Sequence, residues 1–191
     1  MTMKSWLCST VLMAKHPRDS WKLEHFALEV HLTHTLADAP FTSTEREQIY
    51  RVLDQNVNSF SDAERDETRK SIMSFFVGSI GLASDGSQQI LMRGNGGFCG
   101  ATGNCSLWIL VRKGGQLRLA LRTLGQFLIV QKTLARGFHD IAIGQHESAF
   151  DERYKEYRWR GSAYRESDCY LAEKRRTEEP PLDLTFIEAC R

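Results

Sequence analysis

The sequence predicts an α+β fold, in which an N-terminal helical hairpin is followed by an antiparallel β-meander, arranged as a sandwich or as propeller-blade-like sheets. Two helix-start signals precede Ser74, and from Phe75 onward the apolar residues recur with a period of two. Short glycine-containing turns separate the later segments without intervening helices, so the strands should pair antiparallel. A chain of 191 residues, 41% of them hydrophobic, can bury a core without depending on disulfides.

The predicted helical hairpin ends near Ser74. Thr44-Glu45-Arg46-Glu47 has the pattern of a capping box, because the threonine hydroxyl can accept the N3 amide while the N3 glutamate reaches back. Ser61-Asp62-Ala63-Glu64 repeats this signal for a second helix, which is mostly polar and is expected at the surface. The first helix should present four apolar residues on one face, namely Ile49, Leu53, Val57 and Phe60.

Eight strands are expected after the helices, and their patterns distinguish buried from half-buried positions. Residues 106–111 are apolar nearly throughout, which is typical of a central strand. Residues 117–122 alternate leucine with arginine or alanine, which predicts one buried face and one solvated face. The predicted strands are 75–82, 88–93, 106–112, 116–123, 126–131, 139–144, 152–159 and 162–165.

Residues 42–170 form the predicted α+β domain, between two segments of different character. Residues 1–41 are predicted to be an N-terminal extension of uncertain structure, because helical and strand periods compete there. Within it, 6–14 is a short apolar stretch compatible with a decayed secretion signal. Residues 171–191 are predicted to be a C-terminal tail that contains two consecutive prolines, Pro180 and Pro181.

Composition and charge restrict the classes of partner. The chain has 25 basic and 24 acidic residues, a net charge of +1, whereas a dedicated nucleic-acid binder usually carries a basic excess or stripe. No apolar run approaches the roughly 20 residues that a membrane span needs. We therefore expect no nucleic-acid partner, no integral membrane segment and no cofactor.

The most informative stretch is the loop from Cys99 to Cys105, which leads into the apolar strand. Gly100, Gly103 and Asn104 can adopt the positive φ angles that a tight return between two cysteines needs. The sequence therefore predicts a structural disulfide between Cys99 and Cys105 if the protein is exported. The five cysteines of the chain suggest one such pair plus free thiols.

Two other interpretations of this loop remain open from the residues alone. A structural zinc site could draw on Cys99, Cys105, His139, His146 and Cys169, although zinc ligands usually come in closer pairs. Alternatively, Cys99 could be a nucleophile if His139 acts as its base and Asp140 orients the imidazole. The competing interpretation of His139 and Asp140 is a pair at a strand edge.

Aromatic and basic side chains alternate near the end of the predicted meander. Arg158, Trp159, Arg160 and Tyr164 could form an exposed face that binds a protein or a glycan. The alternative is that the aromatic rings make cross-strand pairs that cover a small sheet.

Three segments together resemble an uncharacterised family of small secreted bacterial β-rich proteins. They are the Cys99-Gly100-Ala101-Thr102-Gly103-Asn104-Cys105 loop, the 137–141 segment, and 157–161 with Tyr164, and the likeness covers roughly residues 42–170. The resemblance implies a secreted or periplasmic β-rich module and no particular activity. The turn Ala83-Ser84-Asp85-Gly86 is similar to the calcium loops of FG-GAP-type blades, but Asp85 alone supplies too few oxygen ligands for calcium.

The leading prediction from the sequence is a non-enzymatic extracytoplasmic binding module, or an inhibitor-like protein, located in the periplasm or secreted. The alternative is a cysteine-dependent hydrolase that uses Cys99 and His139. A cytoplasmic location is the alternative to export, because the secretion signal is not clear.

Overall fold

The computed structural model describes residues 32–56, 62–148, 151–175 and 183–190 of the chain. Within them it contains two helices, α1 (Ser43–Asp54) and α2 (Asp62–Met73), the short 3-10 helix η1 (Gly96–Phe98) and ten strands. The strands are β1 (His34–Thr35), β2 (Phe76–Ile80), β3 (Gln89–Arg93), β4 (Cys105–Lys113), β5 (Gln116–Gly125), β6 (Phe127–Ala135), β7 (Phe138–His146), β8 (Asp151–Trp159), β9 (Tyr164–Arg175) and β10 (Asp183–Ala189).

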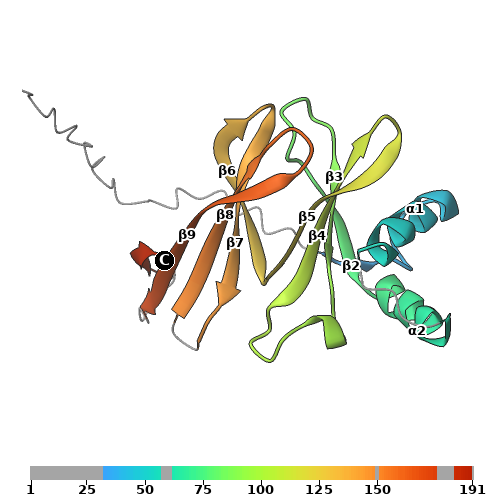
Figure 1. The fold of residues 1–191 in the computed structure, drawn as a ribbon, viewed down its shortest axis with the longest axis horizontal. Coiled ribbons are helices and arrows are strands. Elements are labelled where there is room, and N and C mark those ends of the chain that lie inside the picture. The colour runs from blue at the N-terminus through green and yellow to red at the C-terminus, as the bar shows by residue number, and fades with distance from the viewer. Residues whose placement is uncertain (1–31, 57–61, 149–150, 176–182, 191) are drawn as a thin grey trace, which may run out of the picture.

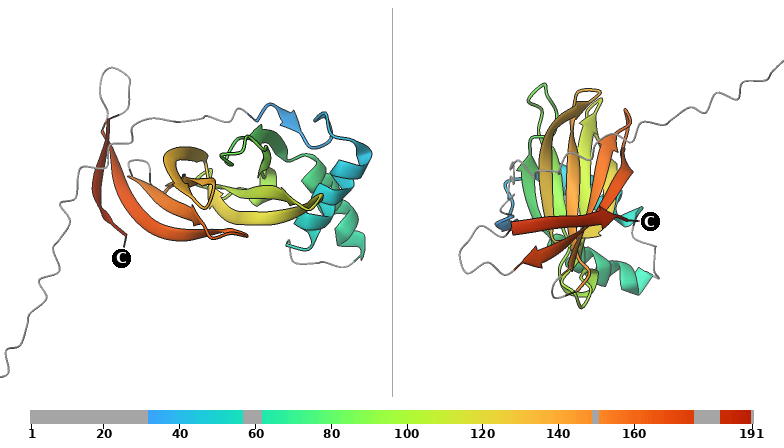
Figure 2. Two further views of the ribbon diagram at one scale, coloured as in Figure 1. Left: turned by 90° about the horizontal axis from the view of Figure 1, so that it is seen from above. Right: turned by 90° about the vertical axis from the view of Figure 1, so that its left-hand side faces the viewer.

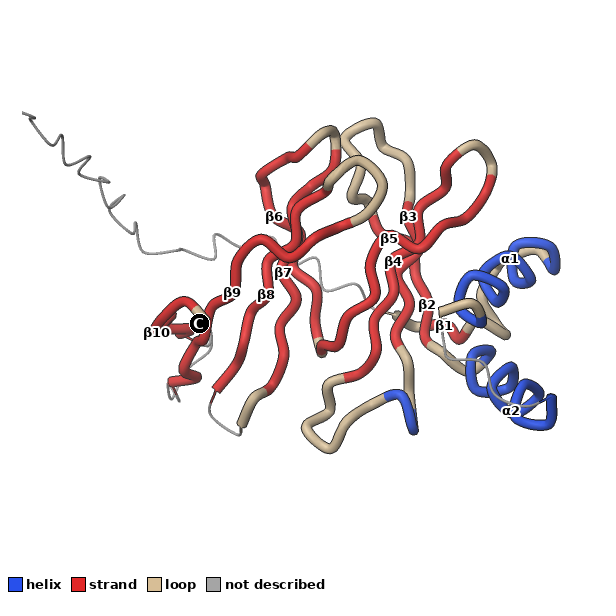
Figure 3. The backbone as a smooth tube through the Cα atoms, in the orientation of Figure 1, coloured by secondary structure: helices blue, strands red, loops and turns tan. Residues whose placement is uncertain are grey.

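The strands form two five-stranded antiparallel sheets, so the predicted mainly antiparallel β architecture with helices is confirmed (Figure 3). Sheet A has the order β1-β2-β3-β4-β5, and sheet B has the order β10-β9-β8-β7-β6. The chain passes from sheet A to sheet B at Gly125, the last residue of β5, and Gln126, which precedes β6. A Cβ at Gly125 would lie 2.3 Å from Ile143 Cγ2, so this corner requires glycine.

The two sheets share a core, which we call the inter-sheet core. Figures 1 and 2 show the helices, sheet A and sheet B in that order along the long axis of the molecule. The inter-sheet core therefore lies in the middle of the structure, and both sheets bury one face in it. Its buried members are Ile80, Leu82, Leu91, Leu107, Ile109, Val111, Ala120, Leu121, Leu128, Val130, Ile141, Ile143, Tyr157, Trp159 and Tyr164.

The outer face of sheet A is covered by α1 and α2, which create a second core, the helix-side core. Ile49 and Leu53 of α1 and Ile72 of α2 are fully buried against it. Trp108 and Leu110 of β4 face the same core, whereas their neighbours in β4 face sheet B. The strand is apolar nearly throughout because both of its faces are buried.

The first helix begins slightly earlier than its predicted signal. The capping box is formed by Thr42 and Glu45, not by Thr44 and Glu47: Glu45 N donates to Thr42 Oγ1 over 3.2 Å, and Thr42 N donates to Glu45 Oε2 over 3.1 Å. Residues 57–61, which would connect the two helices, lie outside the described residues. The hairpin connection therefore stays a prediction.

The folded region extends beyond both predicted domain boundaries. In the predicted extension, Leu36 and Ala39 are buried in the helix-side core, and β1 pairs with β2. In the predicted tail, β9 continues to Arg175 and pairs with β10. The apolar stretch at residues 6–14 lies outside the described residues.

Candidate functional site

The strongest candidate for a contact surface is the Cys loop, residues 99–105, at the start of β4. Cys99 and Cys105 form a disulfide with a Cα–Cα distance of 3.9 Å, and the two residues also make an isolated antiparallel bridge. Gly103 N donates to Gly100 O over 2.9 Å, and Gly103 has the positive φ of 79° that this tight return needs. The loop is therefore closed both covalently and by backbone hydrogen bonds, and its tip at 100–102 is exposed.

Asn104 attaches the Cys loop to sheet B. Its Nδ2 donates to the backbone oxygen of His146 over 2.8 Å, and the His146 backbone amide donates to Asn104 Oδ1 over 2.9 Å. These two reciprocal hydrogen bonds resemble those between paired strands, although the two residues are 42 positions apart in the chain. Gln126 adds a third attachment, because its Nε2 donates to Thr102 O over 2.9 Å.

A partly buried polar network continues from this attachment into sheet B. Gln126 Nε2 lies 3.0 Å from His146 Nδ1, and His146 Nε2 lies 3.2 Å from Glu152 Oε1. The hydroxyl of Tyr154 donates to Glu152 Oε2 over 2.6 Å. Burial, and to a smaller extent this hydrogen bond, raise the pKa of Tyr154 well above its usual value. The network thus connects the base of the Cys loop to the buried residues Glu152 and Tyr154 of β8.

On its other side, the Cys loop is anchored by aromatic packing. Phe98, which immediately precedes Cys99, contacts Phe75 edge-on at 4.7 Å and Trp108 at 6.2 Å between ring centroids. A Cβ at Gly94 would lie 2.6 Å from Phe98 Cβ. Any larger residue at position 94 would therefore collide with Phe98 in its present position. The Cys loop is therefore held from both the helix-side core and sheet B.

The structure does not bring together the residues of the alternative hydrolase site. Cys99 is bonded to Cys105 and is not a free thiol. His139 lies at the opposite end of β7 from His146, the residue that contacts the Cys loop, and seven strand residues span about 23 Å. His139 Nδ1 is 2.7 Å from Gln131 O, and Asp140 Oδ2 accepts from Arg158 Nε over 3.2 Å. Both residues lie in β7, an interior strand of sheet B between β6 and β8, so they are not at a sheet edge.

The predicted exposed aromatic face is corrected by the structure. Trp159 is 5% exposed and Tyr164 is 2% exposed, because both side chains belong to the inter-sheet core. Trp159 stacks on Phe138 with ring centroids 4.2 Å apart, and Tyr164 contacts Trp159 edge-on. Only Arg158 and Arg160 of the predicted binding residues are exposed, so no aromatic surface accompanies them.

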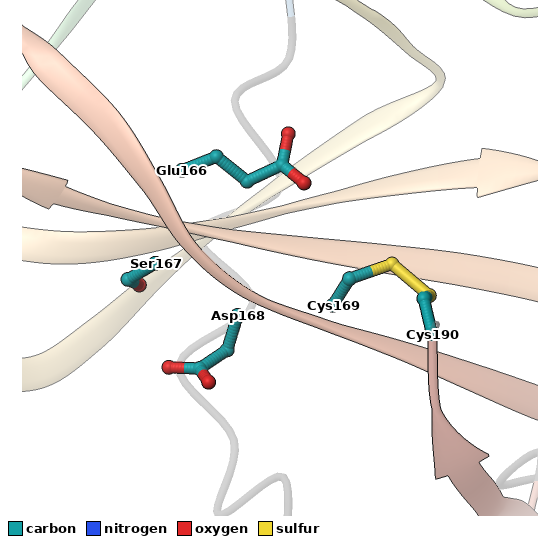
Figure 4. A pocket seen from close by; sticks show the side chains of 5 residues that line it. All are labelled: Glu166, Ser167, Asp168, Cys169 and Cys190. Carbon is teal, nitrogen blue, oxygen red and sulfur yellow. A yellow bond between two sulfur atoms is a disulfide. The ribbon is translucent and has the colours of Figure 1, made fainter.

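The sequence interpretation missed a second disulfide, between Cys169 of β9 and Cys190. It borders a pocket of about 380 Å³ that is lined also by Glu166, Ser167 and Asp168 (Figure 4). Figure 4 shows the two carboxylates pointing in different directions from β9, so they do not converge on a common ligand. Among the described residues, no three His, Cys, Asp or Glu side chains are grouped so that they could hold a metal ion.

The turn at residues 83–86, which resembles a calcium loop in sequence, contains an ordinary local hydrogen bond. Asp85 Oδ1 accepts from Ser87 N over 2.8 Å, and hydrogen bonds from Ser87 lower the pKa of Asp85. This arrangement is the Asx turn that aspartate commonly forms at such positions.

A buried carboxylate in β8, Glu156, is a further feature that the sequence did not reveal. Glu156 is 7% exposed and accepts a hydrogen bond from Gln131 Nε2 over 2.9 Å. Burial raises the pKa of Glu156, and the charges of Asp168 and Asp140 add to this effect. The sequence did not indicate that Glu156 is buried, because glutamate in an alternating strand is normally solvated.

We expect Glu156→Gln to increase stability at neutral pH. A raised pKa in the folded state means that Glu156 favours folding below the usual glutamate pKa and loses this contribution as the pH rises through the raised value. Glutamine keeps the acceptor for Gln131 and carries no charge. Melting temperatures measured from pH 4 to pH 8 should show the variant gaining on the wild type as the pH rises. Glu166→Gln, at an exposed position, is the control. If the melting temperatures of Glu156→Gln and the wild type differed by the same amount at every pH, the expectation would be contradicted.

Comparisons of the chain with family models, with curated proteins and with solved structures found no match. No helix in the described part of the chain is long and apolar enough to cross a membrane. The candidate site therefore rests on its own geometry.

Proposed function

We propose that this protein is a non-enzymatic binding module of an extracytoplasmic compartment, periplasmic or secreted, and that it presents the Cys loop to a protein or glycan partner. The observation that carries the proposal is an exposed loop tip on a rigid base. The disulfide closes the Cys loop, Asn104 and Gln126 attach it to sheet B, and Phe98 anchors it in the helix-side core.

Rigidity favours binding because a preformed loop loses little conformational entropy when a partner docks. Protein inhibitors commonly bind with such preorganised segments. The two disulfides support an oxidising compartment, since cytosolic thiols are normally kept reduced. The inter-sheet core favours the sandwich arrangement over blade-like units, because both sheets contribute side chains to it.

Site-specific photo-crosslinking tests the proposed surface. A photoreactive residue is introduced at Ala101, at the exposed tip, and a matched one at Arg118, an exposed position on β5. Each purified variant is then exposed to the extracytoplasmic fraction of the source cells without reductant. We expect a discrete adduct from position 101 that is missing from position 118. Adducts that are identical at both positions, or no adduct from position 101, would overturn the proposal.

Removing the loop disulfide should cost stability as well as binding. The double variant Cys99→Ser with Cys105→Ser should lose about 2–2.5 kcal/mol of unfolding free energy, since the bond closes a loop of about seven residues. Guanidinium denaturation followed by near-UV circular dichroism measures this loss. Ala101→Ser, at the exposed tip, is the control and should unfold at the wild-type midpoint. A wild-type midpoint for the double variant would show that the disulfide does not constrain the fold.

A further inference from the structure

One cationic side chain lies against the disulfide of the Cys loop. Arg93, the last residue of β3, donates from Nη2 to Cys105 Sγ over 3.7 Å. Its Nε is buried and has no hydrogen-bond partner among the described residues. Within the same part of the chain, Arg93 forms no ion pair with a carboxylate. No carboxylate of the described residues therefore competes with the sulfur of Cys105 for this guanidinium.

The two sulfur-bearing residues differ in exposure. Cys105 is 3% exposed and faces the inter-sheet side of β4 next to Arg93, whereas Cys99 is partly exposed at the edge of the loop. An incoming thiol can thus approach Cys99 more readily than Cys105. Thiol–disulfide exchange depends on which sulfur is attacked and on how well the other sulfur leaves as a thiolate.

We propose that the Cys99–Cys105 disulfide is a site of thiol–disulfide exchange, at which a low-molecular-weight thiol forms a mixed disulfide with Cys99 while Cys105 leaves as a thiolate facing Arg93. The attacking thiolate forms a bond to Cys99 Sγ, and the electron pair of the broken S–S bond goes to Cys105 Sγ. Sulfur is neither oxidised nor reduced overall, because one disulfide replaces another. A second thiolate, attacking the outer sulfur of the adduct, would release a small-molecule disulfide and leave two thiols.

Arg93 assists this step by stabilising the departing charge. A neighbouring guanidinium lowers the pKa of a cysteine thiol, and a thiol with a lower pKa is a faster leaving group. Re-formation of the Cys99–Cys105 bond is favoured by the backbone, since the two Cα atoms are only 3.9 Å apart and the two residues form a β-bridge. Asn104 and Phe98 hold the two ends of the loop after opening, so the Cys105 thiolate can attack the adduct and close the loop again. This inference does not depend on whether the Cys loop contacts a partner.

Reduced glutathione is the probe for the test. Native wild-type protein is incubated with it at pH 8, the reaction is quenched with acid, and peptide mass spectrometry locates the adduct. We expect glutathione on Cys99 and a free thiol on Cys105. An adduct located mainly on Cys105, or no adduct at this pair, would overturn the proposal without any variant.

Variants of Arg93 then test the role of its charge. Arg93→Met, which keeps the length and loses the cation, should slow adduct formation at Cys99 by about 3- to 10-fold, the effect expected when a leaving thiol loses a stabilising charge. Arg93→Lys should restore most of the rate. The exchange rate of Cys169–Cys190 in the same samples is the internal control and should not change. An unchanged rate at Cys99 in Arg93→Met, or equal slowing at both disulfides, would show that Arg93 does not assist the exchange.

Discussion

Trp159→Ala is expected to lower the free energy of unfolding by about 3–5 kcal/mol, the usual cost of truncating a large buried aromatic side chain. Trp159 is 5% exposed and lies in the inter-sheet core. Its ring stacks on Phe138 at 4.2 Å and meets Tyr164 edge-on at 5.2 Å. The substitution would thus leave a cavity in the middle of the structure and remove two aromatic contacts.

Urea denaturation followed by tryptophan fluorescence and circular dichroism measures this loss. Arg160→Ala is the matched control, because the adjacent side chain is exposed and Arg160 makes its hydrogen bonds through the backbone, which alanine keeps: its amide donates to Ala163 O and its oxygen accepts from Arg136 Nη1. We expect the control to unfold within about 0.5 kcal/mol of the wild type, as surface substitutions usually do. If Trp159→Ala matched the control, the ring would not be part of the core, and an exposed aromatic face would have to be reconsidered.

The strands of the meander were predictable because each has a clear pattern and a clear end. The predicted segments 106–112 and 152–159 match β4 and β8 closely, since glycine-containing turns or charged residues bound them. The face that each strand buries was harder to predict. Alternation in β8 separates Trp159 from Arg158, but a single strand does not reveal that a second sheet covers the aromatic side.

The parts that could not be predicted depend on contacts between distant residues. Asn104 and His146 pair across 42 positions, and only the packing of the Cys loop on sheet B brings them together. The Cys169–Cys190 bond likewise requires β10 to pair with β9. Residues 178–181, two acidic residues and two prolines, suggested a tail at this point, so neither β10 nor its disulfide was expected.

The closed loop itself was predictable, but its support was not. Gly100, Gly103 and Asn104 indicated a tight return between Cys99 and Cys105, and the structure forms this disulfide. The anchor of the loop, in contrast, comes from the packing of Phe98 against Phe75, which lies between α2 and β2, and against Trp108 of β4. This packing connects the stability of the helix-side core to the order of the Cys loop.

Trp108→Ala is therefore expected to affect both stability and the Cys loop. Trp108 is fully buried, stacks on Phe75 at 5.1 Å and contacts Phe98 edge-on. Its loss should lower the free energy of unfolding by about 3–5 kcal/mol. It should also remove one of the two aromatic rings against which Phe98 packs. Amide hydrogen exchange over residues 96–105 should accelerate in the folded variant, under conditions where it remains native.

Trp108→Phe separates the packing effect from any polar role of the indole. Trp108 Nε1 is buried and has no hydrogen-bond partner among the described residues, so phenylalanine removes no hydrogen bond and keeps a ring against Phe75 and Phe98. We expect this variant to retain most of the stability and the slow amide exchange of the loop. If Trp108→Ala destabilised the protein while exchange over 96–105 stayed slow, the attachment to sheet B through Asn104 and Gln126 would be sufficient to hold the loop. The aromatic anchor would then serve the helix-side core alone.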